Sequence, residues 1–255
     1  MNVLALQLDI VWENKAANFQ KVANLIRSAA PSANTLVVLP EMFATGFSMD
    51  VSAIHEEAPS ETEQFLGQIT RKHGIAIVAG VVTRGADGRG RNQSIAVLPS
   101  GEVISRYTKL QPFSLSGETT HYAAGHKIAL FEWQGFKISP FVCYDLRFPE
   151  HFRLVSAQGA ELFTVIANWP ITRVSHWITL LRARAIENQA YVIGVNRVGK
   201  DPQYQYPGQS LIVDPWGEVV AEAGEEEGIV QAALDHQKVI QWRRDFPALA
   251  DRKSI

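Results

Sequence analysis

The chain has 255 residues, of which 46% are hydrophobic, and its 24 basic and 26 acidic side chains give a net charge of -2. This length can bury roughly three quarters of the unfolded surface in one or two cores. The balanced charge and the lack of a basic block argue against a nucleic-acid partner, and no apolar run approaches the roughly 18 residues of a membrane helix.

The first half of the chain alternates between predicted strands and helices. Strands are predicted over residues 3–9, 35–40 and 75–82, and shorter ones over 93–99 and 102–109. A helix is predicted over Asn18–Ala29 because its apolar residues follow helical spacing. A second helix has the capping-box pair Ser60 and Glu63 at its start and Gly74 as its stop.

The second half repeats this alternation. Strands are predicted over residues 136–143, 161–170 and 190–197, helices over 149–159 and 174–189, and a hairpin over 209–223. Residues 203–208, "QYQYPG", are expected to form a loop. The mixture predicts a layered α/β fold with sheet packed on sheet and helices outside. Without a linker, a repeat or a signal-peptide pattern, we expect one cytoplasmic domain over residues 1–255.

The only cysteine, Cys143, ends a predicted strand directly before a helix. At such a junction, backbone N–H groups and the helix dipole favour a thiolate and can hold an oxyanion. A free cysteine is more often an inert, buried hydrophobe, so its position alone leaves both interpretations open.

Three charged residues also stand at or near the ends of predicted strands. Glu41 follows "TLVVLP" and Lys109 ends "VISRYTK", while Glu118 lies in "SGETTHYAAG". Ligand sites in α/β proteins gather at strand ends, so the three could join Cys143 as a base and oxyanion stabilisers. Taken singly, each is equally compatible with a solvated surface residue.

Seven segments in order resemble the nitrilase superfamily of carbon–nitrogen hydrolases: "LPEMFATGF", "YTKLQPF", "GETTHYAAG", "FVCYDLRFPE", "ANWP", "RARAIENQAYV" and "GQSLIVDPWGEV". They run from about Val3 to Leu234. Within the superfamily the chain looks most like the ω-amidase branch, which hydrolyses the terminal amide of dicarboxylic acid monoamides such as 2-oxoglutaramate and 2-oxosuccinamate. "CYDLRFP" is the amide-hydrolase form of the cysteine motif, whereas true nitrilases usually carry Trp-Glu after the cysteine.

This resemblance implies a four-layer αββα sandwich and a Glu-Lys-Cys triad. Carried over, Cys143 is the nucleophile that forms a thioester, Glu41 the general base and Lys109 the electrostatic partner, with Glu118 as a supporting glutamate. The N–H of Tyr144 would help Lys109 to hold the oxyanion. A cationic Lys109 would favour the charged forms of both Cys143 and Glu41.

The resemblance also indicates residues that contact the substrate. Asn168 and Trp169 match a segment that lines the pocket, although Trp169 could equally be a core aromatic. Arg147 and Arg173 are candidates for a substrate carboxylate, because a planar guanidinium suits bidentate binding. Arg147 could instead be a structural ion-pair partner.

One segment departs from the family pattern. The lysine segment often reads Tyr-Arg-Lys-x-His-Leu, and Thr108 and Gln111 replace its Arg and His here. The lysine itself is present, so the departure bears on the pocket wall and the substrate more than on the mechanism.

No motif indicates a cofactor. The seven histidines lack metal-ligand spacing and no glycine-rich phosphate loop follows a strand, so we expect no metal, nucleotide or organic cofactor. The expected partners are a small amide substrate and a second copy of the chain, paired through the helix after Pro149 and the helix over 174–189.

Other functions remain open at this stage. They are a general aliphatic amidase, an N-carbamoyl hydrolase or a nitrilase of the same fold, and a non-catalytic binding or regulatory protein. A cysteine hydrolase of the isochorismatase type also uses an acid, a lysine and a cysteine, but the glutamate after "LVVLP" and the "DPWGEV" hairpin fit the nitrilase order.

Overall fold

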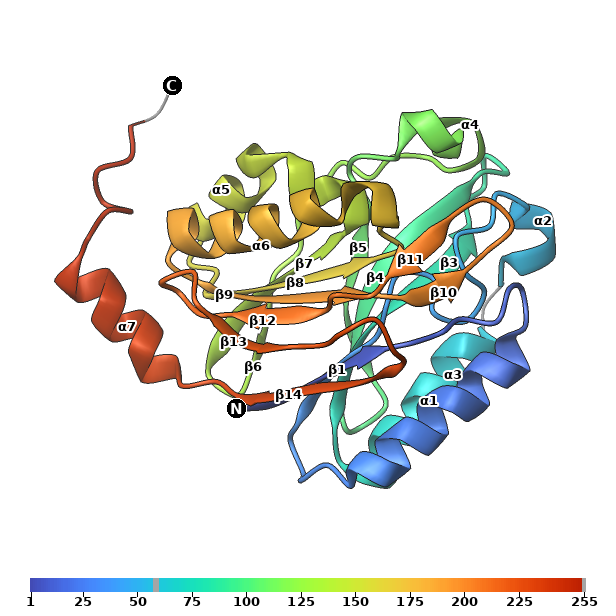
Figure 1. The fold of residues 1–255 in the computed structure, drawn as a ribbon, viewed down its shortest axis with the longest axis horizontal. Helices are drawn as coiled ribbons and strands as arrows, with labels where there is room; N and C mark the ends of the chain where they lie inside the picture. Colours follow the sequence, from blue (N-terminus) through green and yellow to red (C-terminus); the bar gives the residue numbers. More distant parts are fainter. Residues whose placement is uncertain (57–59, 254–255) are drawn as a thin grey trace.

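The computed structural model describes residues 1–56 and 60–253, and within them two six-stranded sheets pack face to face (Figure 1). Helices α1 (Lys15–Ala29) and α3 (Glu61–His73) cover one sheet, and α5 (Pro149–Ala157) and α6 (Val174–Asn188) cover the other. The predicted four-layer αββα sandwich is therefore confirmed.

The first sheet has the strand order β14-β1-β2-β3-β4-β5. Its strands are β1 (Asn2–Gln7), β2 (Leu36–Val38), β3 (Ala76–Arg84), β4 (Gly90–Val97), β5 (Val103–Thr108) and β14 (Gly228–Ala233). β1, β2 and β3 are parallel to one another, and the remaining pairs are antiparallel. β2 is apolar throughout because a parallel strand in this position is covered on both faces.

The second sheet has the strand order β13-β12-β9-β8-β7-β6. Its strands are β6 (Phe131–Trp133), β7 (Phe136–Val142), β8 (Leu162–Ala167), β9 (Tyr191–Asn196), β12 (Leu211–Val213) and β13 (Val219–Glu222). β7, β8 and β9 are parallel, so their carboxyl ends meet at one edge.

A separate hairpin corrects one expectation from the sequence. Residues 203–208 were expected to form a loop, but part of this segment is strand β11 (Gln205–Pro207), which pairs with β10 (Val198–Lys200). Asp201 closes the hairpin by accepting the backbone N–H groups of Gln203 and Tyr204, each at 2.7 Å. These contacts fix Tyr204 at the tip of a defined structure.

The predicted helices end close to where their capping residues stand. Ser60 accepts the N–H of Glu63, and Gly74 ends α3 with a φ of 65°. Besides the β10–β11 hairpin, the elements that were not predicted include α2 (Val51–Ile54), α4 (Glu118–His121), α7 (His236–Asp245) and strands β6 and β14. Within the described part of the chain, no helix combines the length and the apolar character needed to cross a membrane.

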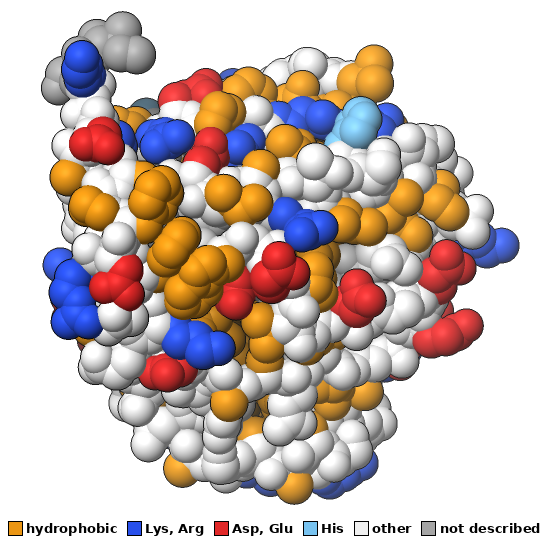
Figure 2. Space-filling view, turned by 60° about the vertical axis from the view of Figure 1, so that its left-hand side comes forward, with side chains coloured by type: hydrophobic (Ala, Val, Ile, Leu, Met, Phe, Trp, Pro, Cys, Tyr) orange, Lys and Arg blue, Asp and Glu red, His pale blue; other side chains and the backbone are white. Residues whose placement is uncertain are grey.

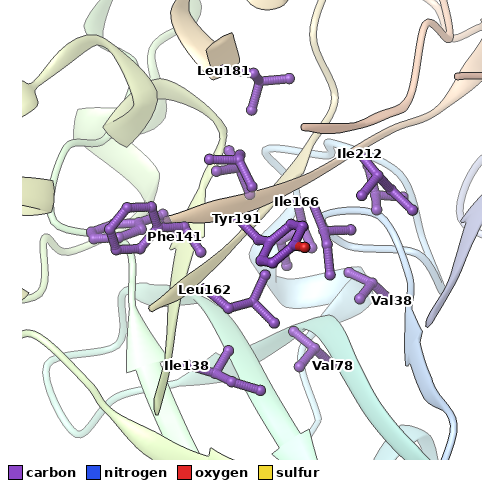
Figure 3. Packing of buried hydrophobic residues seen from close by; sticks show 14 of the residues in the cluster. Val38, Val78, Ile138, Phe141, Leu162, Ile166, Leu181, Tyr191 and Ile212 are labelled. Atoms are coloured by element: carbon purple, nitrogen blue, oxygen red, sulfur yellow. The ribbon is translucent and has the colours of Figure 1, made fainter. Parts of the chain in front are cut away.

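The main core lies between the two sheets and continues between the second sheet and helices α5 and α6 (Figure 3). Val38 and Val78 project from the first sheet toward the layer that holds Leu162 of the second. A second cluster fills the space between the first sheet and helices α1 and α3. Because this apolar contact holds the two sheets face to face, residues at their adjoining edges can come together in one site.

Candidate active site

Three charged side chains lie buried together at this edge. Glu41 follows β2, Lys109 follows β5 and Glu118 opens α4, and each side chain is at most 1% exposed. Lys109 Nζ donates to Glu41 Oε1 at 3.1 Å and to Glu118 Oε2 at 2.8 Å. Neither Lys109 nor Glu118 is the solvated surface residue that its position in the sequence also allowed.

The two carboxylates hold Lys109 as a cation. Burial by itself lowers the pKa of Lys109, but the charges of Glu118 and Glu41 outweigh it and raise that pKa well above its usual value. Lys109 therefore supplies a fixed positive charge and does not exchange a proton near neutral pH.

Asn92 on β4 completes this cluster, and no motif or spacing in the sequence marks it as a site residue. Its Nδ2 donates to Glu41 Oε1 at 2.6 Å and to Glu118 Oε1 at 2.9 Å. The predicted strand began at residue 93, one position too late to include it. Together, Asn92 and Lys109 fix the relative positions of both glutamates.

Asn168, at the end of β8, holds Glu41 from the second sheet. The backbone N–H of Asn168 donates to Glu41 Oε2 at 2.8 Å, and its Nδ2 donates to the same oxygen at 3.2 Å and to the Glu41 backbone oxygen at 2.8 Å. Each carboxylate oxygen of Glu41 thus accepts two hydrogen bonds. These contacts preset the orientation of the carboxylate.

Gly80 on β3 makes room for the turn that carries Glu41. A Cβ at this position would lie 2.3 Å from the backbone nitrogen of Met42 and 2.6 Å from Glu41 Cα. No side chain can occupy that space unless the Glu41 turn moves. The glycine is therefore part of the construction of the site, although it contributes no functional group.

Cys143 stands where β7 becomes a 3-10 turn, Cys143–Arg147, directly before α5. Its φ is 47°, a left-handed conformation that is costly for a residue with a side chain. The residue is 9% exposed, and its Sγ lies 3.9 Å from the backbone oxygen of Asn168. The structure thus presents the thiol on a constrained turn beside Asn168.

Buried polar contacts hold this turn on both sides. The Asp145 carboxyl accepts hydrogen bonds from Val142 N, Gln111 N and the Tyr107 hydroxyl. On the other side, Nε and Nη2 of Arg184 on α6 donate to the Leu146 backbone oxygen at 3.1 and 2.7 Å.

The ionisation of Cys143 is set by its burial and its charged neighbours. Burial, followed by the negative charge of Glu41, raises the pKa of the thiol well above its usual value, and Lys109 offsets only part of this effect. Lys109 does favour the thiolate, as expected, because its charge lowers the pKa of Cys143, but this contribution does not outweigh burial and Glu41. The cation is already neutralised by two carboxylates, so Cys143 rests as a thiol.

A pocket opens over Cys143, with about 370 Å³ of unfilled space that is partly open to solvent. The predicted contact residues Tyr144, Asn168, Trp169 and Arg173 all line it. The other lining residues are Phe47, Phe113, Arg147, Pro170 and Tyr204. Phe47, Phe113 and Tyr204 were not predicted, because they come from loops whose direction depends on the whole fold.

Both candidate arginines lie against aromatic rings of this pocket. The Arg147 guanidinium is 4.9 Å from the Trp169 ring centroid, and that of Arg173 is 5.3 Å from the Phe113 ring. Arg147 Nη2 also lies 3.2 Å from His176 Nδ1. No ion pair to either arginine occurs among the described residues, so the structural ion-pair role considered for Arg147 is not what the structure shows.

In residues 1–56 and 60–253, no group of three or more His, Cys, Asp and Glu side chains is arranged to hold a metal ion. The pocket exposes the Cys143 thiol, and the buried cluster bound to Asn168 adds a carboxylate and a fixed cation. This combination suits covalent catalysis at an acyl carbon.

The comparison with known sequences agrees with this chemistry. The sequence profile of the carbon–nitrogen hydrolase family matches residues 3–244, and the chain belongs to this family. It is 37% identical to a 2-oxoglutaramate amidase of Bacillus subtilis, over 99% of this chain and 98% of that one. It is 39% identical to an omega-amidase of Yersinia enterocolitica, over 98% and 96% of the two chains.

Solved structures share the fold. A carbon–nitrogen hydrolase superfamily protein of Xanthomonas campestris, with an arsenic adduct in its active site, superposes with a TM-score of 0.93 at 33% identity, covering 100% of this chain and 98% of the other. A nitrilase-superfamily member of Saccharomyces cerevisiae gives a TM-score of 0.89 at 31% identity, with 97% and 94% covered. The resemblance read from the seven sequence segments is confirmed.

Proposed function

We propose that this chain hydrolyses the terminal amide of short dicarboxylic acid monoamides, of the 2-oxoglutaramate and 2-oxosuccinamate type, to the carboxylate and ammonia. The observation that carries the proposal is a pocket lined by Cys143, Asn168, Arg147 and Arg173. Asn168 lies against Cys143 Sγ and also binds Glu41 of the buried Glu41–Lys109 pair. The relatives named 2-oxoglutaramate amidase and omega-amidase, similar over their full length, support the same substrate class.

The reaction begins with attack of Cys143 Sγ on the amide carbon. Glu41 takes the thiol proton as the S–C bond forms, because the resting cysteine is protonated. Lys109 and the Tyr144 N–H stabilise the oxyanion.

The tetrahedral intermediate then collapses and the C–N bond breaks. Glu41 returns its proton to the leaving nitrogen, ammonia departs and an acyl thioester remains on Cys143. A water molecule, deprotonated by Glu41, attacks the thioester carbon. The C–S bond breaks, the sulfur regains a proton and the carboxylic acid product leaves.

Glu118 has a supporting part in this cycle. When Glu41 is protonated it no longer balances the charge of Lys109, and Glu118, 2.8 Å from Lys109 Nζ, still does. The cation therefore stays paired and in place throughout both half-reactions.

The far end of the substrate carries a carboxylate in this proposal, and Arg173 or Arg147 would bind it. A charge-assisted hydrogen bond is about twice as strong as a neutral one. The aromatic rings under both guanidinium groups hold them in place, which lowers the entropy lost when the substrate binds.

The test is a comparison of kcat/KM for succinamate or 2-oxoglutaramate with that for butyramide, on one enzyme preparation. The neutral amide should be poorer by about 10²-fold or more, because the arginine is then left unpaired. Arg173→Met and Arg147→Met show which arginine binds the substrate carboxylate, since replacing that arginine removes the preference for the acid over the neutral amide. Equal values for acid and neutral amide would instead assign a general aliphatic amidase.

We also propose that the protein is a cytoplasmic homodimer. Leu154 on α5 is 54% exposed and Ile186 on α6 is 53% exposed, as expected if these helices pair with a second copy. Figure 2 shows further hydrophobic side chains on the side of the molecule that carries α7. Ile240 on α7 and Phe246 directly after it are exposed, as is Trp216, whose ring centroid lies 5.0 Å from that of Trp242 on α7. A free nucleophilic thiol suits a reducing compartment.

A further inference from the structure

We infer that Asp145 is a positioning residue that sets the place of Cys143 relative to Lys109 by tying the end of β7 to the end of β5. The inference rests on the proposed function in one respect, the role of Cys143 as the nucleophile. Asp145 itself does not contact the substrate pocket, because it is absent from the residues that line it.

The contacts of Asp145 flank both functional residues. Its side chain is 0% exposed. Oδ2 accepts the N–H of Val142, the residue before Cys143, at 3.0 Å. Oδ1 accepts the N–H of Gln111, two residues after Lys109, at 2.9 Å. The hydroxyl of Tyr107, two residues before Lys109, donates to Oδ2 at 2.8 Å.

Backbone hydrogen bonds do not connect β5 to β7. β5 is the edge strand of the first sheet and pairs with β4, whereas β7 lies in the second sheet between β6 and β8. The two strands otherwise meet through apolar contacts such as the Tyr107 and Phe141 rings, whose centroids are 5.8 Å apart. Apolar contact is non-directional, so it does not fix the register of one sheet over the other. Asp145 supplies directional bonds at the required point.

A carboxyl group suits this role better than its amide counterpart. Burial, only partly offset by the bonds from Val142, Tyr107 and Gln111 and by the charge of Lys109, raises the pKa of Asp145 to about 7. In either protonation state both oxygens still have lone pairs for the two backbone N–H groups. An asparagine would place an NH₂ donor against one of them, and that contact would be lost.

The position of Asp145 also fits the strain at the nucleophile. Cys143 has its left-handed φ two residues earlier, and such a conformation persists only where the surroundings enforce it. The bond to Val142 N anchors the strand on one side of that residue. Arg184, through Leu146 O, anchors the other side.

The experiment compares Asp145→Asn and Tyr107→Phe with wild type and with Tyr191→Phe. Tyr191 is a buried tyrosine on β9 whose hydroxyl contacts Asp235 O at 3.4 Å, outside the pocket, so it is a matched control. Two rates are measured on folded protein: kcat and KM with succinamate, and alkylation of Cys143 by iodoacetamide.

Asp145→Asn should lower kcat by about 10²-fold with KM within about threefold, because a displacement of about 1 Å is enough for that loss while the pocket wall is retained. Alkylation should slow in parallel, since the thiol moves away from Glu41. Tyr107→Phe keeps both backbone bonds and should lose about 3- to 10-fold, the value of roughly one hydrogen bond. Tyr191→Phe should change neither rate.

Unchanged kcat and alkylation in folded Asp145→Asn would overturn the inference. If Asp145→Asn does not fold, Tyr107→Phe provides the test. A kcat and an alkylation rate within twofold of wild type in that variant would reject the positioning role. The alkylation rate needs no substrate. If the wild-type protein does not hydrolyse succinamate, the proposed function is rejected. The alkylation rates of the variants still test the role of Asp145 in that case.

Discussion

Lys109 is surrounded by two carboxylates, so the buried cluster of Glu41, Glu118 and Lys109 carries one net negative charge. Together with burial, which is the larger cause, this balance explains why the pKa of Cys143 is raised in the resting protein. It also separates two roles that are often combined. In the proposed reaction Glu41 moves the proton, while Glu118 keeps the cation paired.

Substitutions in this cluster should separate catalysis from stability. Cys143→Ala should abolish amide hydrolysis and Glu41→Gln should lower kcat by roughly 10²–10⁴-fold, because the nucleophile and the general base are lost. Lys109→Ala should lose activity to a similar degree and also stability, by about 3–5 kcal/mol, since two buried carboxylates lose their cation. Turnover and thermal unfolding are measured for each.

The double variant Lys109→Ala/Glu118→Gln is the control for the lysine. Removing one carboxylate should restore part of the lost stability, because less uncompensated charge is buried. It should not restore activity, because the oxyanion still lacks Lys109. Recovery of turnover in the double variant would show that Lys109 serves the fold rather than the reaction.

The reactivity of Cys143 without substrate should depend on pH in a definite direction. Because burial and Glu41 raise the pKa of the thiol, the thiolate fraction is small at neutral pH and grows as the pH rises. The rate of alkylation by iodoacetamide should therefore still be increasing at pH 9. A plateau below pH 8 would mean a thiolate in the resting protein and would contradict the structure.

The sequence predicts the reacting groups of the proposed mechanism but not the residues that orient them. Cys143, Glu41 and Lys109 stand at strand ends inside recognisable motifs. Asn92 and Asp145 have no comparable mark, because a buried polar residue gains its meaning from donors and acceptors elsewhere in the chain. The raised pKa of Cys143 could not be predicted for the same reason, since it depends on burial and on a charge balance among three segments.

At the level of the elements, close packing of β3 against the Glu41 turn has a measurable consequence. Gly80→Ala should displace Glu41 and Met42, lowering stability by about 1–3 kcal/mol and reducing kcat. Gly228→Ala on β14 is the matched control, because a Cβ there meets no atom within 4 Å. Thermal unfolding and turnover should be unchanged in the control, and equal effects in both variants would reject the steric explanation.

Elements with strong local determinants were predicted well. α3 has both its capping residue and its glycine stop, and α1 and α6 follow helical periodicity over 15 residues each. The four-residue helices α2 and α4 and the three-residue strand β11 lack enough length for a periodic pattern. β14 is stabilised by pairing with β1, more than two hundred residues away, which local sequence cannot reveal.

At the scale of the whole molecule, the exposed apolar faces of α5 and α6 should pair with a second copy. Light scattering at micromolar protein should give the mass of a dimer, and the double variant Leu154→Glu/Ile186→Glu should give about half that mass, because charges are then buried at the contact. The same substitutions on the exposed Val11 and Leu115 serve as a control. A monomeric wild-type protein would contradict the assignment.

The site joins both sheets: Glu41 and Lys109 follow strands of the first sheet, and Cys143 and Asn168 follow strands of the second. Neither sheet alone contains a working set of groups. Enzymatic turnover is consequently expected only after the two sheets have packed against each other in the native register. In a refolding experiment, far-UV ellipticity can recover when each sheet has formed, but ammonia release can recover only when the two sheets have packed together. The recovery of activity therefore measures the packing of the two sheets, separately from the formation of secondary structure.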